Sequence, residues 1–201
     1  MTEHPDRAAL EVEDDALAAD LDEVEAVDPE REVRRQLALA QIRRYGDPVL
    51  RMRANEVTAF DDELRRVTER MVELMHHADG IGLAATQVGI LRRVFVFADD
   101  GVDRVLVNPV LVQVGEETQT DEEGCLSLPL VRVPVERATA VTLEGRDAAG
   151  EPVRLELEGL SARVVQHELD HLDGTLIIDR TDPDSRRAAL SQLRPRTVLT
   201  R

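Results

Sequence analysis

The chain has 201 residues, of which 42% are hydrophobic, and its formal net charge is −16. This length suits one compact domain, which would bury roughly 70% of the surface that the unfolded chain exposes. No apolar run reaches the roughly 20 residues that a membrane-spanning helix needs, so we expect no membrane partner. With three Phe, one Tyr and no Trp, the chain lacks aromatic platforms for stacking nucleic acid bases, and we expect no sequence-specific nucleic-acid binding.

The first 38 residues differ in composition from the rest. Residues 1–40 contain 13 acidic residues and 4 arginines, a net charge of −9. Because few large apolar residues and no aromatic ones occur there, we predict an acidic N-terminal extension over residues 1–38 that is disordered or loosely helical. It could act as a solubilising tail or as an interaction segment. Residues 39–201 would form a single domain, and the absence of a recognisable signal or transit sequence at the start favours a cytoplasmic location.

The folded domain is predicted to begin with a turn at 45–48, followed by a long amphipathic helix. Asp61 or Asp62 can cap this helix, which would end at Gly80. Adjacent His76 and His77 point about 100° apart around the helix axis, so we expect surface histidines there and not a metal site. The apolar positions recur at helical spacing, at Leu64, Val67, Met71, Leu74, Met75 and Ala78.

Short runs with β-strand character follow, at 93–97, 105–107, 110–114, 138–143 and 153–157. Most of them are too close together for helical crossovers, which favours antiparallel pairing. A helix is then predicted from Leu160 or Ser161 to Gly174, with apolar residues on two sides, so it should be buried on both. The Asp182-Pro183 pair predicts a last helix that runs to about Leu193.

The predicted helix at 160–174 carries the motif Gln-His-Glu-Leu-Asp-His at 166–171. Its two histidines, His167 and His171, lie one turn apart with Cβ atoms about 5 to 6 Å from each other, and can hold one metal ion. Two structural histidines bonded to the backbone are the alternative. The only cysteine, Cys125, cannot form an intramolecular disulfide and can supply a third ligand. Three such ligands leave the fourth tetrahedral position open, as in catalytic sites.

Glu168 directly follows the first histidine of this motif. It could lie over the open position of the metal and act as a general base, or it could be a surface glutamate. Asp170 would either orient a metal-bound histidine or face solvent. A thiolate ligand favours Fe(II), Ni, Co or Zn over Mg or Ca, without selecting one of the four.

The segment Gly-Ile-Gly-Leu-Ala-Ala-Thr-Gln at 80–87 has glycines that permit a close backbone approach. It lacks both the Lys-Ser/Thr ending of a phosphate-binding loop and the third glycine of a dinucleotide-binding motif. Gln87 could donate its amide to a carbonyl oxygen that gains charge in a tetrahedral transition state. A glutamine that caps a turn in the core is the alternative.

Three segments together resemble the signature motifs of the peptide deformylases, namely GIGLAATQ at 80–87, EGCLS at 123–127 and QHELDH at 166–171. All three are intact and in the family order, and the resemblance covers about Ile42 to Leu193. It implies a hydrolase that removes the formyl group from the N-terminal formyl-methionine of nascent polypeptides and releases formate. It also implies an α+β fold, with antiparallel β-sheets packed around a central metal-bearing helix.

The resemblance assigns roles to individual residues. Cys125, His167 and His171 would bind the metal, with Fe(II) as the native ion and Ni, Co or Zn able to replace it. Glu168 would be the general base. The oxyanion would be stabilised by the side chain of Gln87 and the backbone N–H of Leu126. The peptide substrate would lie against Ile81, Gly82, Glu123, Gly124 and Arg132.

Two other functions remain open from the residues alone. An endopeptidase of the His-Glu-x-x-His class usually takes its third ligand downstream of the helix, but Ile177 stands where that histidine would be needed. A non-catalytic, metal-stabilised binding protein would need a fourth ligand, and the sequence offers no obvious one.

The C-terminal segment 185–201 has five arginines and no acidic residue. Solvated arginines near a helix end are the simpler interpretation. The same place meets the ribosome in some deformylases, so the resemblance makes contact with an anionic partner such as the ribosome the alternative.

Overall fold

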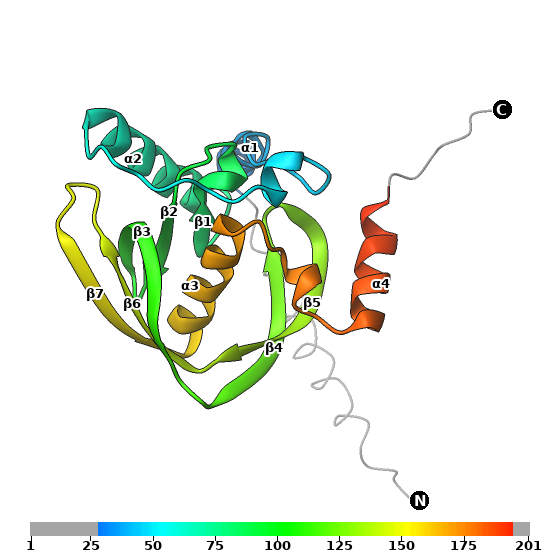
Figure 1. Cartoon of the computed structure of the whole chain (residues 1–201). Coiled ribbons are helices and arrows are strands. Elements are labelled where there is room, and N and C mark those ends of the chain that lie inside the picture. The colour runs from blue at the N-terminus through cyan, green and yellow to red at the C-terminus, as the bar shows by residue number, and fades with distance from the viewer. Residues whose placement is uncertain (1–27, 195–201) are drawn as a thin grey trace, which may run out of the picture.

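The computed structural model describes residues 28–194, and the predicted features at 1–27 and 195–201 lie outside the described residues. Within residues 28–194 the chain folds into two antiparallel sheets and four α-helices (Figure 1). The large sheet has the strand order β1 (Gly82–Ala84), β2 (Val94–Asp99), β3 (Val102–Val114), β6 (Ala140–Arg146) and β7 (Pro152–Glu158). The small sheet is a hairpin of β4 (Thr118–Cys125) and β5 (Leu128–Ala138). The helices are α1 (Pro29–Leu39), α2 (Asp62–His77), α3 (Gly159–Leu172) and α4 (Pro183–Leu193), with short 3₁₀ turns η1 (Pro48–Arg51), η2 (Ala85–Val88) and η3 (Ile177–Asp179). The predicted α+β fold with antiparallel sheets is confirmed.

Strand β2 explains how the large sheet is covered on both faces. Successive side chains of a strand point to opposite faces. Val94 and Val96 belong to the apolar core beside α2, whereas Phe95 and Phe97 belong to the core beside α3. The two phenylalanine rings meet edge to face with centroids 5.9 Å apart. A strand that is covered on both faces is apolar at every position. The sequence Val-Phe-Val-Phe therefore shows no alternation of apolar and polar residues.

Helix α3 lies between the large sheet and the β4–β5 hairpin (Figure 1). Val165, Leu169 and Leu172 of this helix pack into the core of the large sheet, and Glu168 and His171 on its other side are also buried. The helix is therefore buried on two sides, as predicted. Because both sides are covered, side chains of α3 can meet the hairpin without exposure to bulk water.

The predicted caps of α2 and α4 are confirmed. Asp61 accepts a hydrogen bond from the backbone N–H of Leu64 at 2.9 Å, and Asp182 accepts from the N–H of Asp184 at 2.9 Å. These contacts satisfy N–H groups that have no partner within the helix. His76 is exposed and pairs with Asp103, in agreement with the predicted surface position.

Strand β3 replaces the two separate strands predicted at 105–107 and 110–114. The pairing with β6 shifts register between Val107 and Val110. Asn108 in this gap has a φ of 50°, and Pro109 has no N–H to donate to the ladder. The strand thus continues through a bulge that the sequence presents as a break. The side chain of Asn108 uses the bulge to bond both the N–H and the carbonyl of Val57, each at 2.8 Å.

The β4–β5 hairpin was not among the predicted strands. Strand β4 reads Thr-Gln-Thr-Asp-Glu-Glu-Gly-Cys, a polar run whose residues are mostly exposed. Its partner β5 alternates clearly, with Val131, Val133 and Val135 buried against Leu176, Ile177 and Ile178. The hairpin therefore exists because β5 has a core to cover, and β4 follows as its pairing partner.

Helix α1 lies within the predicted acidic extension. Asp28 caps it by accepting from the N–H of Glu30 at 3.0 Å, and Pro29 takes the first turn. Ala38 is 2% exposed and packs with Ile42 in the core beside α2. Within residues 28–194 no helix combines the length and the apolar character that a bilayer crossing requires.

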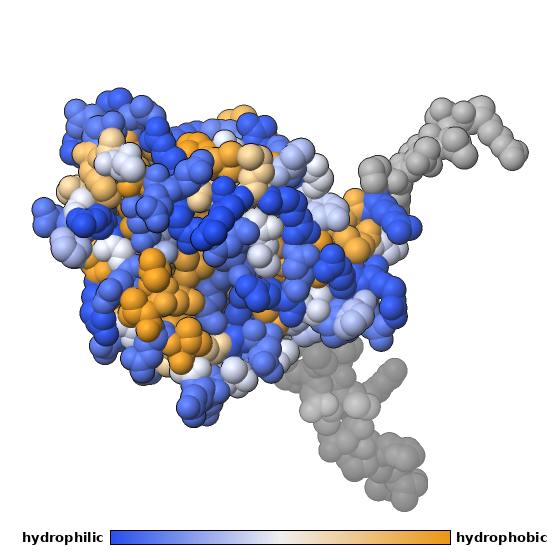
Figure 2. Space-filling view, in the orientation of Figure 1, coloured by the Kyte–Doolittle hydropathy of each residue, from blue (hydrophilic) through white to orange (hydrophobic). Residues whose placement is uncertain are grey.

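Part of the surface near β3 is apolar. Figure 2 shows an orange patch among the hydrophilic residues on this side of the molecule. On β3, Val110, Val112 and Val114 are each exposed by about half. Val110 and Val114 line a surface groove together with Gln166 and Leu169 of α3. Single exposed apolar residues are ordinary.

Candidate metal centre and catalytic site

Two segments far apart in sequence supply three side chains that meet at one point on α3. Cys125 comes from the end of β4, whereas His167 and His171 come from α3, and one ligand atom from each lies within 4.8 Å of the others. The Sγ of Cys125 is 3.2 Å from Nε2 of His171. The two imidazole rings stand edge to face with centroids 4.9 Å apart. The structure thus brings together the three predicted ligands.

The donor set fits a divalent transition metal. Metal–sulfur and metal–nitrogen bonds of about 2.3 and 2.0 Å at a tetrahedral angle put the two donor atoms about 3.5 Å apart, close to the observed 3.2 Å. Within residues 28–194 no further His, Cys, Asp or Glu joins this group. The set therefore offers three ligands and one open position, which argues against the closed site of a purely structural metal protein.

Glu123 orients the first histidine. Its Oε2 lies 3.0 Å from Nδ1 of His167, which leaves Nε2 of that ring for a metal. Burial alone would raise the pKa of Glu123, but hydrogen bonds from His167 and Arg137 outweigh this effect and lower the pKa to about 2. The side chain is therefore a fixed carboxylate. Its contacts are with the histidine and with two arginines, because Nη1 of Arg163 also donates to Oε1 at 2.8 Å. The residue also borders the cavity where we predicted substrate binding.

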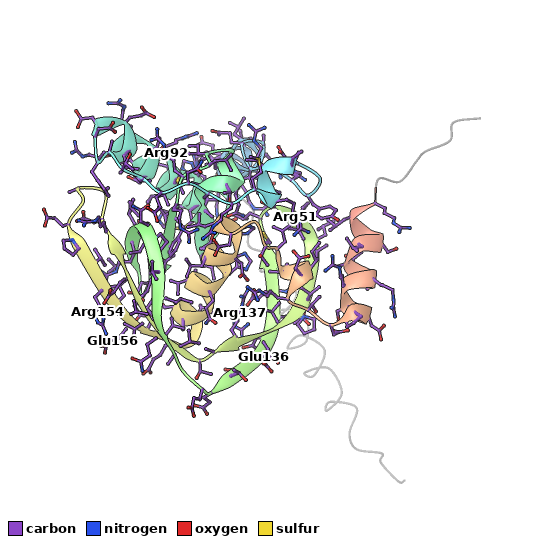
Figure 3. The ribbon with its side chains drawn as sticks, in the orientation of Figure 1. Arg51, Arg92, Glu136, Arg137, Arg154 and Glu156 are labelled. Atoms are coloured by element: carbon purple, nitrogen blue, oxygen red, sulfur yellow. The ribbon has the colours of Figure 1, made fainter. Side chains whose placement is uncertain are left out.

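Arg137 ties the hairpin to α3. Its Nε and Nη2 donate to the two carboxylate oxygens of Glu123 at 3.0 and 3.1 Å, and its Nη1 donates to Asp170 at 2.6 Å. Figure 3 places it between α3 and the β4–β5 hairpin. The sequence analysis missed this residue. One signal was present, because Arg137 continues the alternation of Val131, Val133 and Val135 and so takes a buried position of β5.

The prediction for Asp170 was wrong in both alternatives. The residue is 8% exposed, and it accepts hydrogen bonds from Arg137 and, at 3.0 Å, from Nε of Arg180. It therefore neither orients a histidine directly nor faces solvent. Its carboxylate compensates the buried guanidinium that holds Glu123 in place.

Glu168 is buried beside the metal ligands and is not the surface glutamate of the alternative. It is 3% exposed, and its Oε2 has no hydrogen-bond partner among the described residues. Burial raises the pKa of Glu168 to about 7, against an opposing effect of His167. A carboxyl group that titrates near neutral pH can both accept and return a proton.

Gly82 allows the backbone of β1 to lie against Glu168. A Cβ atom at this position would overlap Oε1 of Glu168 and come within 2.9 Å of Cγ1 of Val164. The glycine predicted to permit a close approach therefore permits the approach of the Glu168 carboxyl group. Gly80 is less crowded, with Cδ1 of Leu126 at 3.0 Å from such an atom.

Gln87 is held with its amide nitrogen toward the centre. It is 2% exposed, and its Oε1 accepts from the backbone N–H of Ala84 at 2.9 Å. This bond directs the NH₂ group to Sγ of Cys125 at 3.6 Å and to Oγ of Ser127 at 3.2 Å. Gln87 thus caps the η2 turn and also faces the site, so the two alternatives for it coexist. The contact with Ser127 was not predicted.

A cavity of about 640 Å³ opens onto this centre. Three of the residues that line the cavity are apolar and exposed to solvent. Ile81 is 50% exposed, Leu130 is 96% exposed and Leu160 is 64% exposed. All the residues predicted for substrate and oxyanion binding line this cavity, namely Ile81, Gly82, Gln87, Glu123, Gly124, Leu126 and Arg132. Ile177 lies elsewhere, 3% exposed in the core under the hairpin, and it does not line this cavity.

Comparison with known proteins identifies the family. The family described as "Polypeptide deformylase" matches residues 39–187. The chain belongs to the peptide deformylase family. Peptide deformylase 1 of Corynebacterium efficiens is 48% identical over 162 residues, which cover 79% of this chain and 96% of that protein. Deformylases are metal-dependent hydrolases that remove N-formyl groups from nascent peptides, and this deformylase presents a Cys-His-His site for the metal.

Solved structures agree with this assignment. The crystal structure of peptide deformylase from Thermotoga maritima has a TM-score of 0.69 and 50% identity, and the match covers 71% of this chain and 97% of that one. The crystal structure of the enzyme from Thermus thermophilus has a TM-score of 0.72 and 44% identity, covering 76% of this chain and 91% of that one. The deformylase fold and the site on α3 therefore belong to the same part of the chain.

The contact between Gly82 and Glu168 gives a first prediction. Gly82→Ala should displace the Glu168 side chain and lower kcat by about 100-fold, since a misplacement of about 1 Å can cost that much. Formate release measures the rate, and bound metal and thermal unfolding are measured on the same sample. A variant that keeps its metal, its fold and the wild-type kcat would contradict the assigned contact.

The position of Glu123 gives a second prediction. Glu123→Gln removes the charge that His167 and Arg137 share, and metal affinity should fall by about 10- to 100-fold. Competition with a chelator of known affinity measures this. The adjacent, exposed Glu122 provides the matched control, because Glu122→Gln should leave metal affinity unchanged. Equal affinities of the two variants would show that Glu123 does not support His167.

Proposed function

We propose that this chain hydrolyses the formyl group of N-terminal formyl-methionine on nascent polypeptides, releasing formate, at the centre formed by Cys125, His167, His171 and Glu168. One observation carries this proposal. A buried carboxyl group with a free oxygen atom lies directly beside a three-ligand set with one open position. That pairing suits hydrolysis of an amide without a serine or cysteine nucleophile.

A divalent ion held by the three ligands would supply Lewis acidity that makes water nucleophilic near neutral pH. Glu168 would accept a proton from that water and deliver it to the nitrogen of the leaving amine, so that the formyl C–N bond breaks and formate and a free amino terminus result. The side-chain NH₂ of Gln87 and the backbone N–H of Leu126 would donate to the carbonyl oxygen as it gains charge. The orientation of Gln87 supports this role, because its own oxygen atom is already engaged by Ala84.

The cavity supports an apolar first residue in the substrate. Ile81, Leu130 and Leu160 offer apolar surface for a methionine side chain. Gly82 and Gly124 leave room for the peptide backbone, and Arg132 would contact the peptide farther along. Buried apolar contacts would give binding energy, whereas the groups at the metal would act on the formyl group.

For the metal we propose Fe(II), with Ni, Co or Zn as ions that can replace it. The single thiolate favours these borderline ions over Mg or Ca. Metal analysis of protein purified without oxygen identifies the ion, and the activity restored by each ion added to metal-free protein ranks them.

Glu168→Gln tests the assigned chemistry. The substitution keeps the size of the side chain but removes the base, so bound metal should stay the same while kcat falls by about 100- to 10,000-fold. Formate release from a formyl-methionyl tripeptide measures the rate. Loss of metal in this variant would contradict the role as a base. Wild-type protein that cleaves an unformylated internal peptide and leaves the formyl-methionyl one intact would favour the endopeptidase instead.

We also propose that the basic C-terminal segment touches the ribosome in the cytoplasm, where nascent chains emerge. In α4, Arg186 pairs with Asp179 at 3.1 Å and Arg187 pairs with Asp184, so part of the positive charge is compensated. Helix α4 also packs on the hairpin through Ala189, which is 2% exposed. Removing the helix would therefore disturb the fold, and substitutions that neutralise individual arginines are the cleaner test.

The double substitution Arg187→Gln with Arg194→Gln should weaken co-sedimentation with ribosomes. Each lost phosphate contact should reduce the slope of log affinity against log salt by about 1. A matched control neutralises Arg65 and Arg154, which are also exposed and paired with carboxylates. An unchanged slope in the first variant, or an equal change in both, would refute the contact.

A further inference from the structure

Helix α1 borders the catalytic cavity although it lies almost wholly outside the part shared with the family. The family match begins at residue 39, where α1 ends. Two of its residues, Arg35 and Leu39, nevertheless line the same cavity as Cys125, His167 and Glu168. The walls of the substrate cavity in this chain therefore include a helix that the matched region does not contain.

The contact between α1 and the cavity wall runs through Asp79. Arg31 donates from Nη2 to Oδ1 of Asp79 at 2.8 Å, and Nε of Arg35 lies 3.0 Å from Oδ2. Both carboxylate oxygens are thus held by α1. The hydrogen bond from Arg31, together with the charge of Arg35, holds the pKa of Asp79 below its ordinary value. The carboxylate stays charged, and the contact persists, across the neutral range.

Asp79 begins the short segment that carries the proposed substrate contacts. Its φ of 54° is unusual for a residue with a side chain and needs support from its surroundings. Gly80 is anchored behind it by its N–H to the carbonyl of Met75, and the carbonyl of Ile81 accepts from Ala98 at 3.0 Å. These bonds fix the backbone on the side of the sheet. On the side of α1, the two arginines hold the segment through Asp79.

We propose that Arg31 and Arg35 are positioning residues for the substrate, and that α1 is an additional wall of the substrate cavity, acting by holding the segment 79–82 against the bound peptide. This inference rests on the proposed deformylase activity. It gives the N-terminal helix a role in substrate binding, which neither the acidic composition of residues 1–40 nor the family motifs indicate.

The kinetic consequence follows from where α1 makes contact. Cys125, His167 and Glu168 have no ion pair or hydrogen bond with α1 among the described residues, so the chemical step should be insensitive to it. Ile81 and the cavity wall should become less ordered without the Asp79 contact, which weakens binding of the peptide. Loss of the contact with Asp79 should therefore raise KM and leave kcat nearly unchanged.

Arg35→Ala and Arg34→Ala form a matched pair for the test. Both residues are paired arginines on α1, but among the described residues Arg34 pairs only with Asp28 and Glu30, near the start of the helix. Ala38 and Leu39 anchor α1 through apolar contacts, so neither substitution should release the helix. With a formyl-methionyl tripeptide, Arg35→Ala should raise KM by about threefold or more and leave kcat within about twofold, whereas Arg34→Ala should change neither. Arg35→Lys keeps the charge and should restore a KM close to that of the wild type.

A second variant keeps the test decisive if Arg35→Ala unfolds. Asp79→Asn tolerates the positive φ and removes the charge, and it should raise KM in the same way. Equal KM values for the Arg35 and Arg34 variants, or a loss in kcat at constant KM, would overturn the inference. The wild type is assayed first, and absence of formate release from the tripeptide would overturn the proposed function. If the wild type is active and Asp79→Asn has the same KM as the wild type, only the role of α1 is overturned.

Discussion

The catalytic centre depends on the buried ion pairs between the β4–β5 hairpin and α3. Arg137 on β5 contacts Glu123 on the neighbouring strand and Asp170 on the helix, and all three side chains are at least 90% buried. Removing one partner from such a group typically costs about 3 to 5 kcal/mol, because a charge is left buried without compensation. Hairpin and helix are therefore held in one arrangement. Cys125 at the end of β4 can meet the histidines only in that arrangement.

The same contacts also fix the orientation of His167, one of the three predicted metal ligands. Glu123 receives two hydrogen bonds from Arg137 and has one oxygen atom beside Nδ1 of His167. The ring of His167 is thereby fixed from behind, and its other nitrogen atom is free for the metal. Burial raises the pKa of both carboxyl groups of the site, but only at Glu123 do hydrogen bonds from charged partners outweigh it. Glu123 has cationic partners and a pKa of about 2, whereas Glu168 lacks a hydrogen-bond partner for Oε2 and has a pKa of about 7. One carboxylate therefore stays charged and holds a ligand, and the other can exchange protons.

Helix α3 lies between the apolar core of the large sheet and the β4–β5 hairpin. Its apolar residues complete the core of the large sheet, and its polar residues face the hairpin. The tight approach of β1 at Gly82 closes the site on a third side. Helix α1, outside the region matched to the family, adds a fourth wall through Asp79. The three predicted metal ligands and Glu168 thus lie within the family match, whereas part of the cavity wall comes from a helix that lies almost wholly outside it.

The sequence alone determined what depends on local spacing. Histidines at 167 and 171 share a face of a helix, Asp61 or Asp62 can cap one helix and Asp182 another, and a glycine at 82 permits a close approach. The three deformylase motifs added the fold and the ligand set. The tertiary structure decided which distant residues meet. The polar strand β4 has no pattern of its own, so its pairing with β5 could not be read from the chain. Likewise, Arg137 and Asp170 became partners, and Asp79 met α1, only because packing brought together segments that no local periodicity relates.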